Sequence, residues 1–109
     1  MGYYCVFCEI IAGREPGTIR YQDTEVIIID NILRWAPVMM MAMPKKHLAQ
    51  QELWQSELLH KVSSAAVSLA EDLCPNGFRL LSNFGPDALQ TQHHAHIHVL
   101  GGFHLGPYL

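Results

Sequence analysis

Five runs of apolar residues along the chain are typical of β-strands. They span residues 19–22, 25–30, 38–43, 78–84 and 93–100. The first two flank Asp23-Thr24, a turn-forming pair, and therefore predict a hairpin. Pro44 ends the third run, and an irregular loop over residues 85–92 separates the last two.

Two segments follow a helical pattern instead. Residues 51–73 carry apolar side chains near helical spacing and predict one long helix, which Pro75-Asn76-Gly77 ends. Residues 6–13 predict a short helix closed by Gly13. This order of elements predicts an α+β fold, with a five-stranded, mainly antiparallel sheet, one long helix on one face and a short N-terminal helix.

Histidines dominate the last predicted strand. His94, His96 and His98 alternate with the apolar residues Ala95, Ile97 and Val99. Because a strand turns successive side chains to opposite faces, this spacing predicts three imidazoles on one face and an apolar surface on the other. Imidazoles grouped in this way indicate either a metal site or a catalytic set.

Composition and charge limit the kinds of protein and partner that are possible. At 109 residues we expect a single domain over 1–109, and the formal net charge of −3 argues against a nucleic-acid partner. No apolar run is long enough to span a membrane and no signal-peptide pattern is seen, so we expect a cytoplasmic protein. An odd number of cysteines, 3, argues against a disulfide framework. The low charged fraction, 16%, suggests that a partner subunit covers part of the surface.

The histidine segment is part of a longer motif. Asn83-x-Gly85, Gln90-Thr91 and His94-x-His96-x-His98-Val99-Leu100-Gly101-Gly102 together resemble the signature of the histidine triad (HIT) superfamily. The N-terminal residues 7–13 and the segment Pro44-Lys45-Lys46-His47 resemble the same family in the same order. The branch most similar to this chain is that of small histidine triad nucleotide-binding proteins, so the resemblance implies a HIT-like fold.

The resemblance also implies chemistry at the α-phosphorus of a purine nucleotide conjugate. The position of His96 matches the nucleophile that forms a nucleotidyl-histidine, and His98 matches the phosphate-binding histidine. Thr91 matches a hydroxyl near the leaving group. Asp30 matches the carboxylate that binds ribose hydroxyls, and Asn83 a side chain at the ribose–phosphate end. Without the triad, Asp30 and Asn83 would be interpreted as turn residues.

The pair Cys5 and Cys8 indicates a second kind of site. A structural zinc site needs four sulfur or nitrogen ligands, and Cys-x-x-Cys supplies two of them. Some bacterial members of the family complete the set with histidines at the positions of His47 and His94. The resemblance therefore implies structural Zn²⁺ on these four residues. The alternative is a pair of reduced cysteines that pack under the first helix.

Three residues depart from the family pattern. Met39 stands where many members have a fourth histidine, Leu89 where the loop often has glycine, and Phe103 where arginine is frequent. The thioether of Met39 cannot donate a hydrogen bond, so we expect the catalytic efficiency of the protein to be reduced. The leading expectation is a purine nucleoside phosphoramidase. The alternatives are a non-catalytic, zinc-stabilised nucleotide-binding or signalling module and a dinucleoside polyphosphate hydrolase.

The resemblance finally implies a two-fold homodimer formed through the long helix and the neighbouring strand. This helix is poor in charge from Val62 to Ala70, and residues 63–66 offer a small, nearly neutral surface. The C-terminal residues 107–109 are expected to reach the partner's site. The alternative is that this face of the helix packs only on its own sheet.

Overall fold

The computed structural model describes residues 4–107, so Tyr108 and Leu109, which were expected to reach a partner, lie outside the described residues. Its strands are β1 (Ile19–Gln22), β2 (Val26–Asp30), β3 (Val38–Pro44), β4 (Phe78–Leu81) and β5 (Ile97–Gly101). Its helices are α1 (Val6–Ile11), α2 (Gln50–Trp54) and α3 (Leu58–Leu73), with a 3₁₀ turn, η1 (Pro86–Ala88).

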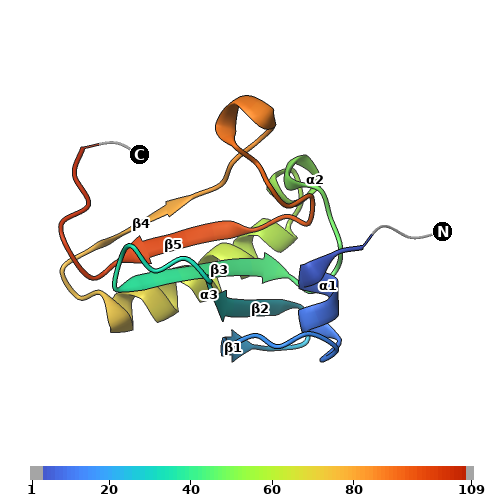
Figure 1. Ribbon diagram of the computed structural model, residues 1–109, viewed down its shortest axis with the longest axis horizontal. Helices are drawn as coiled ribbons and strands as arrows, with labels where there is room; N and C mark the ends of the chain where they lie inside the picture. The colour runs from blue at the N-terminus through green and yellow to red at the C-terminus, as the bar shows by residue number, and fades with distance from the viewer. Residues whose placement is uncertain (1–3, 108–109) are drawn as a thin grey trace.

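The strands form one antiparallel sheet in the order β1-β2-β3-β5-β4, with α3 crossing behind it (Figure 1). The predicted α+β fold with five antiparallel strands is therefore confirmed. Asp23 makes the predicted β1–β2 hairpin turn, because its Oδ1 accepts hydrogen bonds from the backbone N–H groups of Glu25 and Val26, both at 2.8 Å.

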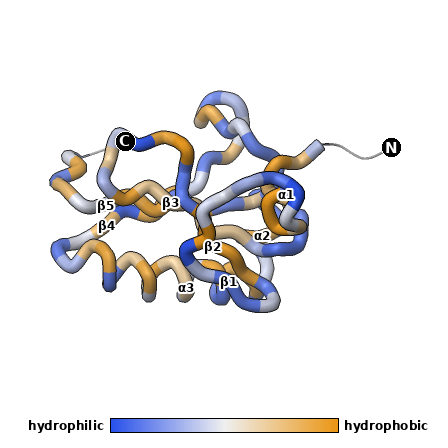
Figure 2. Tube along the Cα trace, turned by 60° about the horizontal axis from the view of Figure 1, so that its bottom comes forward, coloured by the Kyte–Doolittle hydropathy of each residue, from blue (hydrophilic) through white to orange (hydrophobic). Residues whose placement is uncertain are grey.

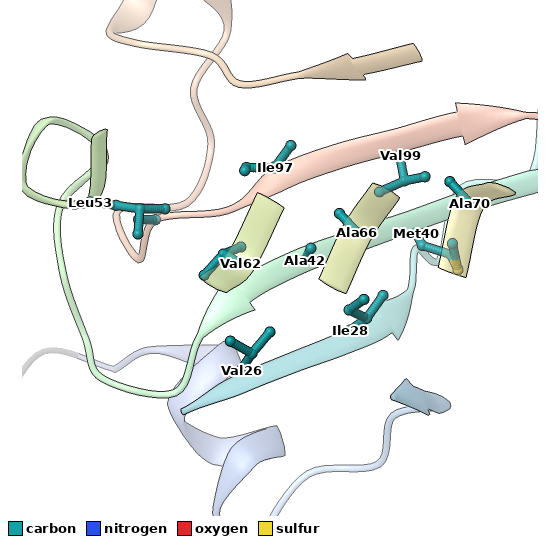
Figure 3. Close-up of a cluster of buried hydrophobic side chains, with 11 residues drawn as sticks. Val26, Ile28, Met40, Ala42, Leu53, Val62, Ala66, Ala70, Ile97 and Val99 are labelled. Carbon is teal, nitrogen blue, oxygen red and sulfur yellow. The ribbon is translucent and has the colours of Figure 1, made fainter. Parts of the chain in front are cut away.

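The main core lies between the sheet and α3. Val62, Ala66 and Ala70 lie one helical turn apart and contact alternate residues of the central strands (Figure 3). In Figure 2, α3 lies below β3, β4 and β5 as a separate layer. The other residues of this core are Leu53 of α2 and the strand and loop residues Val26, Ile28, Met40, Ala42, Ala95, Ile97 and Val99.

The opposite face of the sheet is only partly covered. Cys5 and Phe7, at the start of α1, pack with Ile27, Ile29 and Met43 in a second buried cluster. In Figure 1, α1 lies at the end of the sheet where β3 terminates. His96 and His98 lie next to this cluster, immediately before β5 and on β5.

The helix predicted over residues 51–73 is two helices. α2 ends at Trp54 and α3 starts at Leu58. Ser56 causes the break, because both its backbone N–H and its hydroxyl donate to the carbonyl of Leu53, at 3.1 and 2.9 Å. A serine side chain bonded in this way competes with continued helical pairing. The interruption lets Leu53 enter the core while α3 takes its own direction.

The last strand begins later than predicted, at Ile97 instead of residue 93. The residues before it leave the sheet, because the Ala95 N–H donates to the Leu48 carbonyl at 2.7 Å. The strand predicted over residues 78–84 is also shorter than expected and ends at Leu81. His94 and His96 are therefore held by contacts other than strand pairing, and only His98 is part of the ladder.

The prediction of which helix residues face a second subunit also needs correction. Ala66 is fully buried against the sheet of its own chain, so it cannot belong to an exposed surface. The outer side of α3 instead carries a shallow hollow lined by Ser63, Ser64, Val67, Ser68 and Glu71. None of the helices in residues 4–107 has the length and apolar character needed to cross a membrane.

Candidate active site and metal cluster

Two of the three histidines form a contact pair beside the exposed part of the sheet. His98 lies on β5, opposite Met41 of β3, and His96 comes immediately before the strand. Their rings meet edge to face with centroids 4.9 Å apart. The alternation in the sequence therefore identifies two imidazoles that share a site, although only one belongs to a strand.

The backbone of His96 is held by side chains that the sequence did not single out. Gln50 is fully buried at the start of α2; its Oε1 accepts from the His96 N–H at 3.2 Å and its Nε2 donates to the His96 carbonyl at 3.1 Å. The Ser82 hydroxyl donates to the same carbonyl at 2.7 Å. These bonds replace the sheet pairing that is absent before Ile97.

The ring of His96 is oriented by its neighbour. Its Nδ1 lies 2.9 Å from the carbonyl oxygen of His94. A carbonyl only accepts, so the proton must sit on Nδ1, which leaves the lone pair on Nε2. Burial lowers the pKa of His96, so the ring is neutral at pH 7. A neutral imidazole with a free Nε2 is suited to act as a nucleophile.

His94 has a different environment from the other two histidines. Its Nε2 lies 2.8 Å from the Pro44 carbonyl and so carries the proton, while its Nδ1 lies 3.6 Å from the Sγ atoms of both Cys5 and Cys8. The Cys8 Sγ also lies 3.2 Å from Nδ1 of His47. The structure thus brings together all four residues of the expected metal set.

The geometry of this cluster fits a tetrahedral metal ion. The four ligand atoms all lie within 4.8 Å of one another, and zinc bound by sulfur and nitrogen requires ligand–ligand separations of about 3.3–3.8 Å. Burial raises the pKa of the Cys8 thiol to about 11, so a cation is needed to displace its proton at neutral pH. Burial lowers the pKa of His94 to about 4, which keeps its ring neutral as a ligand must be.

Phe7 separates the metal cluster from the histidine pair. Its ring meets those of His94 and His96 edge-on, at centroid distances of 5.8 and 5.3 Å. Because Phe7 lies in the first turn of α1, the N-terminal segment packs directly against the residue that precedes the strand. Sequence reasoning treated Phe7 only as part of a motif, and nothing in its type indicated this contact.

A cavity of about 740 Å³ opens beside the histidine pair. His96, His98, Thr91 and Asp30 all line it, so four of the predicted active-site residues share one space. The apolar part of the lining comes from α1, β2, β3 and the loop after β2, and consists of Val6, Phe7, Ile10, Ile29, Ile32, Leu33 and Met41. Asn83 lies outside this lining within residues 4–107; its carbonyl accepts from Gln50 Nε2 at 3.2 Å. The role expected for Asn83 stays a prediction.

The loop that carries Thr91 is closed by Gln90. The Gly85 N–H donates to its Oε1 at 2.8 Å, and its Nε2 donates to the Gln92 carbonyl at 3.1 Å. Leu89 adopts a left-handed conformation with φ 58°, which costs a non-glycine residue about 1–2 kcal/mol. This conformation explains why glycine suits the position at which this chain has leucine.

Asp30 has two partners that sequence reasoning missed. One carboxylate oxygen lies 3.1 Å from Arg20 Nε, and the other lies 3.5 Å from Arg34 Nη2. Arg20 is on the neighbouring strand β1, and Arg34 is four residues along the chain. Asp30 therefore faces the cavity with both of its oxygens already in ion pairs.

Comparisons with known proteins show the family of this chain. The family described as "Scavenger mRNA decapping enzyme C-term binding" matches residues 4–107. A HIT family hydrolase from Clostridium thermocellum has 39% identity and a TM-score of 0.90, with 100% of this chain and 99% of that chain covered. A HIT-like protein of Chlamydia muridarum is 33% identical over 93% of this chain and 83% of its own length. The chain belongs to the histidine triad family.

One relative within these comparisons is named for zinc binding. A 14 kDa zinc-binding protein from Brassica juncea is 28% identical to this HIT protein, over 89% of this chain and 91% of the relative. Membership of this family places the chain among nucleotide-binding hydrolases.

The other two departures from the family pattern lie at the edge of the site. Met39 is buried with Ala36 and Leu100, and it pairs in register with Leu100, whereas Met41 lies opposite His98. Phe103 packs against Trp35 with ring centroids 6.3 Å apart. Neither residue lines the cavity of this HIT protein within the described chain.

The buried histidines predict a loss of stability in acid. Burial, reinforced by the nearby His96, lowers the pKa of His98 to about 4, against 6.5 in an open chain. As pH falls from 6.5 towards 4, the unfolded chain binds a proton that the folded protein does not, so unfolding becomes easier. Above about pH 7 this contribution is constant. We expect the melting temperature to fall between pH 7.5 and pH 5, and to fall less in His98→Asn.

Calorimetry of both proteins at the two pH values tests this, since all other titrating groups are shared. An equal fall in wild type and His98→Asn would contradict the assigned pKa, as would greater stability at pH 5.

Proposed function

We propose that this HIT protein hydrolyses purine nucleoside phosphoramidates or related nucleotide conjugates at the α-phosphate, through a nucleotidyl-His96 intermediate. The observation that carries the proposal is the bond from His96 Nδ1 to the His94 carbonyl, which leaves Nε2 free and neutral beside the cavity. The apolar walls of that cavity suit a flat base, and its polar side suits ribose and phosphate.

The proposed reaction has two displacements. In the first, the Nε2 lone pair of His96 forms a bond to the α-phosphorus while the P–N bond to the amine breaks, and the amine departs with a proton. In the second, water attacks phosphorus and the bond to Nε2 breaks, which releases the nucleoside monophosphate and restores neutral His96. Dividing one difficult displacement into two is the advantage of covalent catalysis.

The other residues of the cavity support these steps. His98 is neutral at pH 7, so we expect it to donate an N–H to a phosphate oxygen and not to act as a cation. Thr91 is exposed and has a hydroxyl, so it can pass a proton from water to the departing amine. Asp30 is assigned to the ribose hydroxyls and Asn83 to the ribose–phosphate end, as the family resemblance implies.

Replacing the nucleophile tests the proposal. We expect His96→Ala to lower the hydrolysis of an adenosine phosphoramidate by at least about 10³-fold while AMP still binds, because the attacking atom is lost. His60→Ala is the matched control, since His60 is an exposed histidine on α3. Hydrolysis is followed by the release of AMP.

Free imidazole should partly restore activity in His96→Gly, which separates lost chemistry from lost folding. Undiminished hydrolysis in His96→Ala would contradict the covalent mechanism. A wild-type protein that binds AMP but cleaves neither a phosphoramidate nor a dinucleoside polyphosphate would favour the non-catalytic module instead.

We further propose that the four-residue cluster holds structural Zn²⁺. The donor set Cys5, Cys8, His47 and His94 has the ligand types and spacing of a closed tetrahedral site. The second nitrogen of His94 donates to the Pro44 carbonyl, as the outer nitrogen of a metal-bound histidine usually does. When bound, the ion would tie the N-terminal segment to the residue that orients His96.

Metal content and stability should change together. Purified protein is expected to contain about one zinc ion per chain, and Cys8→Ser should lower both the zinc content and the melting temperature. The physical reason is that the binding energy of a structural site is also folding energy. Cys74→Ser is the matched control, because Cys74 is a buried cysteine outside the cluster.

Elemental analysis and thermal unfolding on the same samples give the answer. A Cys8→Ser protein that keeps its zinc would contradict this ligand set, and loss of zinc without any change in melting would leave the cysteines as packing residues.

We also propose a two-fold homodimer. β4 is an edge strand of the described sheet, so a second β4 can extend the sheet across a two-fold axis. The outer side of α3 presents small residues around Val67. Since Ala66 faces the core, the substitution that tests this surface has to be made at Ser64, which is exposed.

Sedimentation at micromolar concentration should show a wild-type dimer and a Ser64→Glu monomer, because the new charge would be buried without a partner. Gln51→Glu, an exposed position on α2, should remain dimeric. A monomeric wild type would rule out the assembly, and a dimeric Ser64→Glu would move the interface elsewhere.

A further inference from the structure

The ion pairs around Asp30 leave an excess of positive charge at the rim of the cavity. Arg20 and Arg34 each contact one oxygen of a single carboxylate, so the three side chains together carry one net positive charge. Among the described residues that line the cavity, Asp30 is the one acid and Arg34 the one arginine or lysine. Because Arg20 also pairs with Asp30, the described residues that line the cavity hold no further carboxylate to balance the positive charge of Arg34.

The two arginines differ in how firmly they are held. Arg20 is the closer partner, at 3.1 Å, and it projects from the regular strand β1. Arg34 lies 3.5 Å from the carboxylate, has 61% of its side chain exposed, and is carried by the loop after β2. Asn31 shapes that loop, since its Oδ1 accepts from the Leu33 N–H at 3.0 Å. Arg20 alone can neutralise Asp30, which leaves Arg34 available to a ligand.

The position of this charge relative to the reacting atoms decides what it would recognise. The proposed function places the α-phosphorus at His96 and the ribose hydroxyls at Asp30, and Arg34 borders the same end of the cavity. A guanidinium has five donors in a planar fork and matches the oxygens of a phosphate. In dinucleotide-binding sites, an arginine near the ribose accommodates a phosphate on the 2′ oxygen, whereas an acid binds the free hydroxyl.

We propose that Arg34 makes this HIT protein selective for nucleotides that carry a phosphate on the 2′ or 3′ oxygen of the ribose. This inference rests on the proposed function, because it takes the ribose to lie at Asp30. Arg34 would turn from the Asp30 carboxylate to the added phosphate, while Arg20 continues to neutralise the acid. With a nucleotide that lacks this phosphate, Arg34 would stay paired with Asp30 and would add nothing to the binding affinity.

Calorimetric titration of the wild-type protein at low salt tests the selectivity. The ligands are AMP, adenosine 3′,5′-bisphosphate and adenosine 2′,5′-bisphosphate, none of which has a leaving group at the α-phosphate. We expect one of the bisphosphates to bind about 10-fold or more tightly than AMP, and the ratio to shrink as salt is added. Which isomer binds more tightly identifies the ribose oxygen.

Arg34→Gln should bring the ratio of affinities close to one. Arg14→Gln is the matched control, because Arg14 is also an exposed arginine in an ion pair, with Glu9, and should keep the wild-type ratio. Equal binding of AMP and both bisphosphates would overturn the inference, as would a preference that survives in Arg34→Gln. Failure of all three nucleotides to bind would overturn the proposed function itself.

Discussion

The site depends on the hydrogen bonds and contacts made by one residue, His94. One ring nitrogen donates to the carbonyl at the end of β3, and the other faces the sulfur atoms at the start of α1. Its own carbonyl accepts the Nδ1–H of His96. A single residue therefore connects the N-terminal segment, the central strand and the imidazole with the free lone pair. Because both nitrogens of His94 are engaged, neither its ring nor its carbonyl can turn without breaking another contact.

The sheet lets this arrangement coexist with a stable core. Period-two alternation sends Val99 and Ile97 toward α3 and His98 to the other face, so packing and chemistry use opposite sides of one strand. Where the strand has not yet begun, Gln50 supplies both of the backbone hydrogen bonds that a neighbouring strand would otherwise make to His96. A fully buried amide on α2 thus takes the place of sheet pairing at the residue whose position matters most.

Local patterns predicted the elements well, and contacts between distant residues were what they missed. The Asp23 hairpin and the Cys-x-x-Cys pair are each visible in a few adjacent residues, and the structure has them as expected. The alternating histidines are visible in the same way, but only His96 and His98 share the cavity, and His47 and His94 joined the expected metal set through the family resemblance. The break at Ser56 and the late start of β5 depend on particular hydrogen bonds, to Leu53 and Leu48, that apolar periodicity does not encode. Gln50 and Arg34 look like ordinary surface residues in the sequence, because their roles come from what the fold places beside them.

The central claim is that Nε2 of His96 attacks phosphorus. Detection of the covalent intermediate would test this claim most directly. The protein would be mixed with an adenosine phosphoramidate, quenched within the first turnover, and its intact mass and fragment masses measured. The account predicts a mass increase equal to one adenylyl group, located on His96. Turnover without any adduct, or an adduct located on His98 or Thr91, would contradict it.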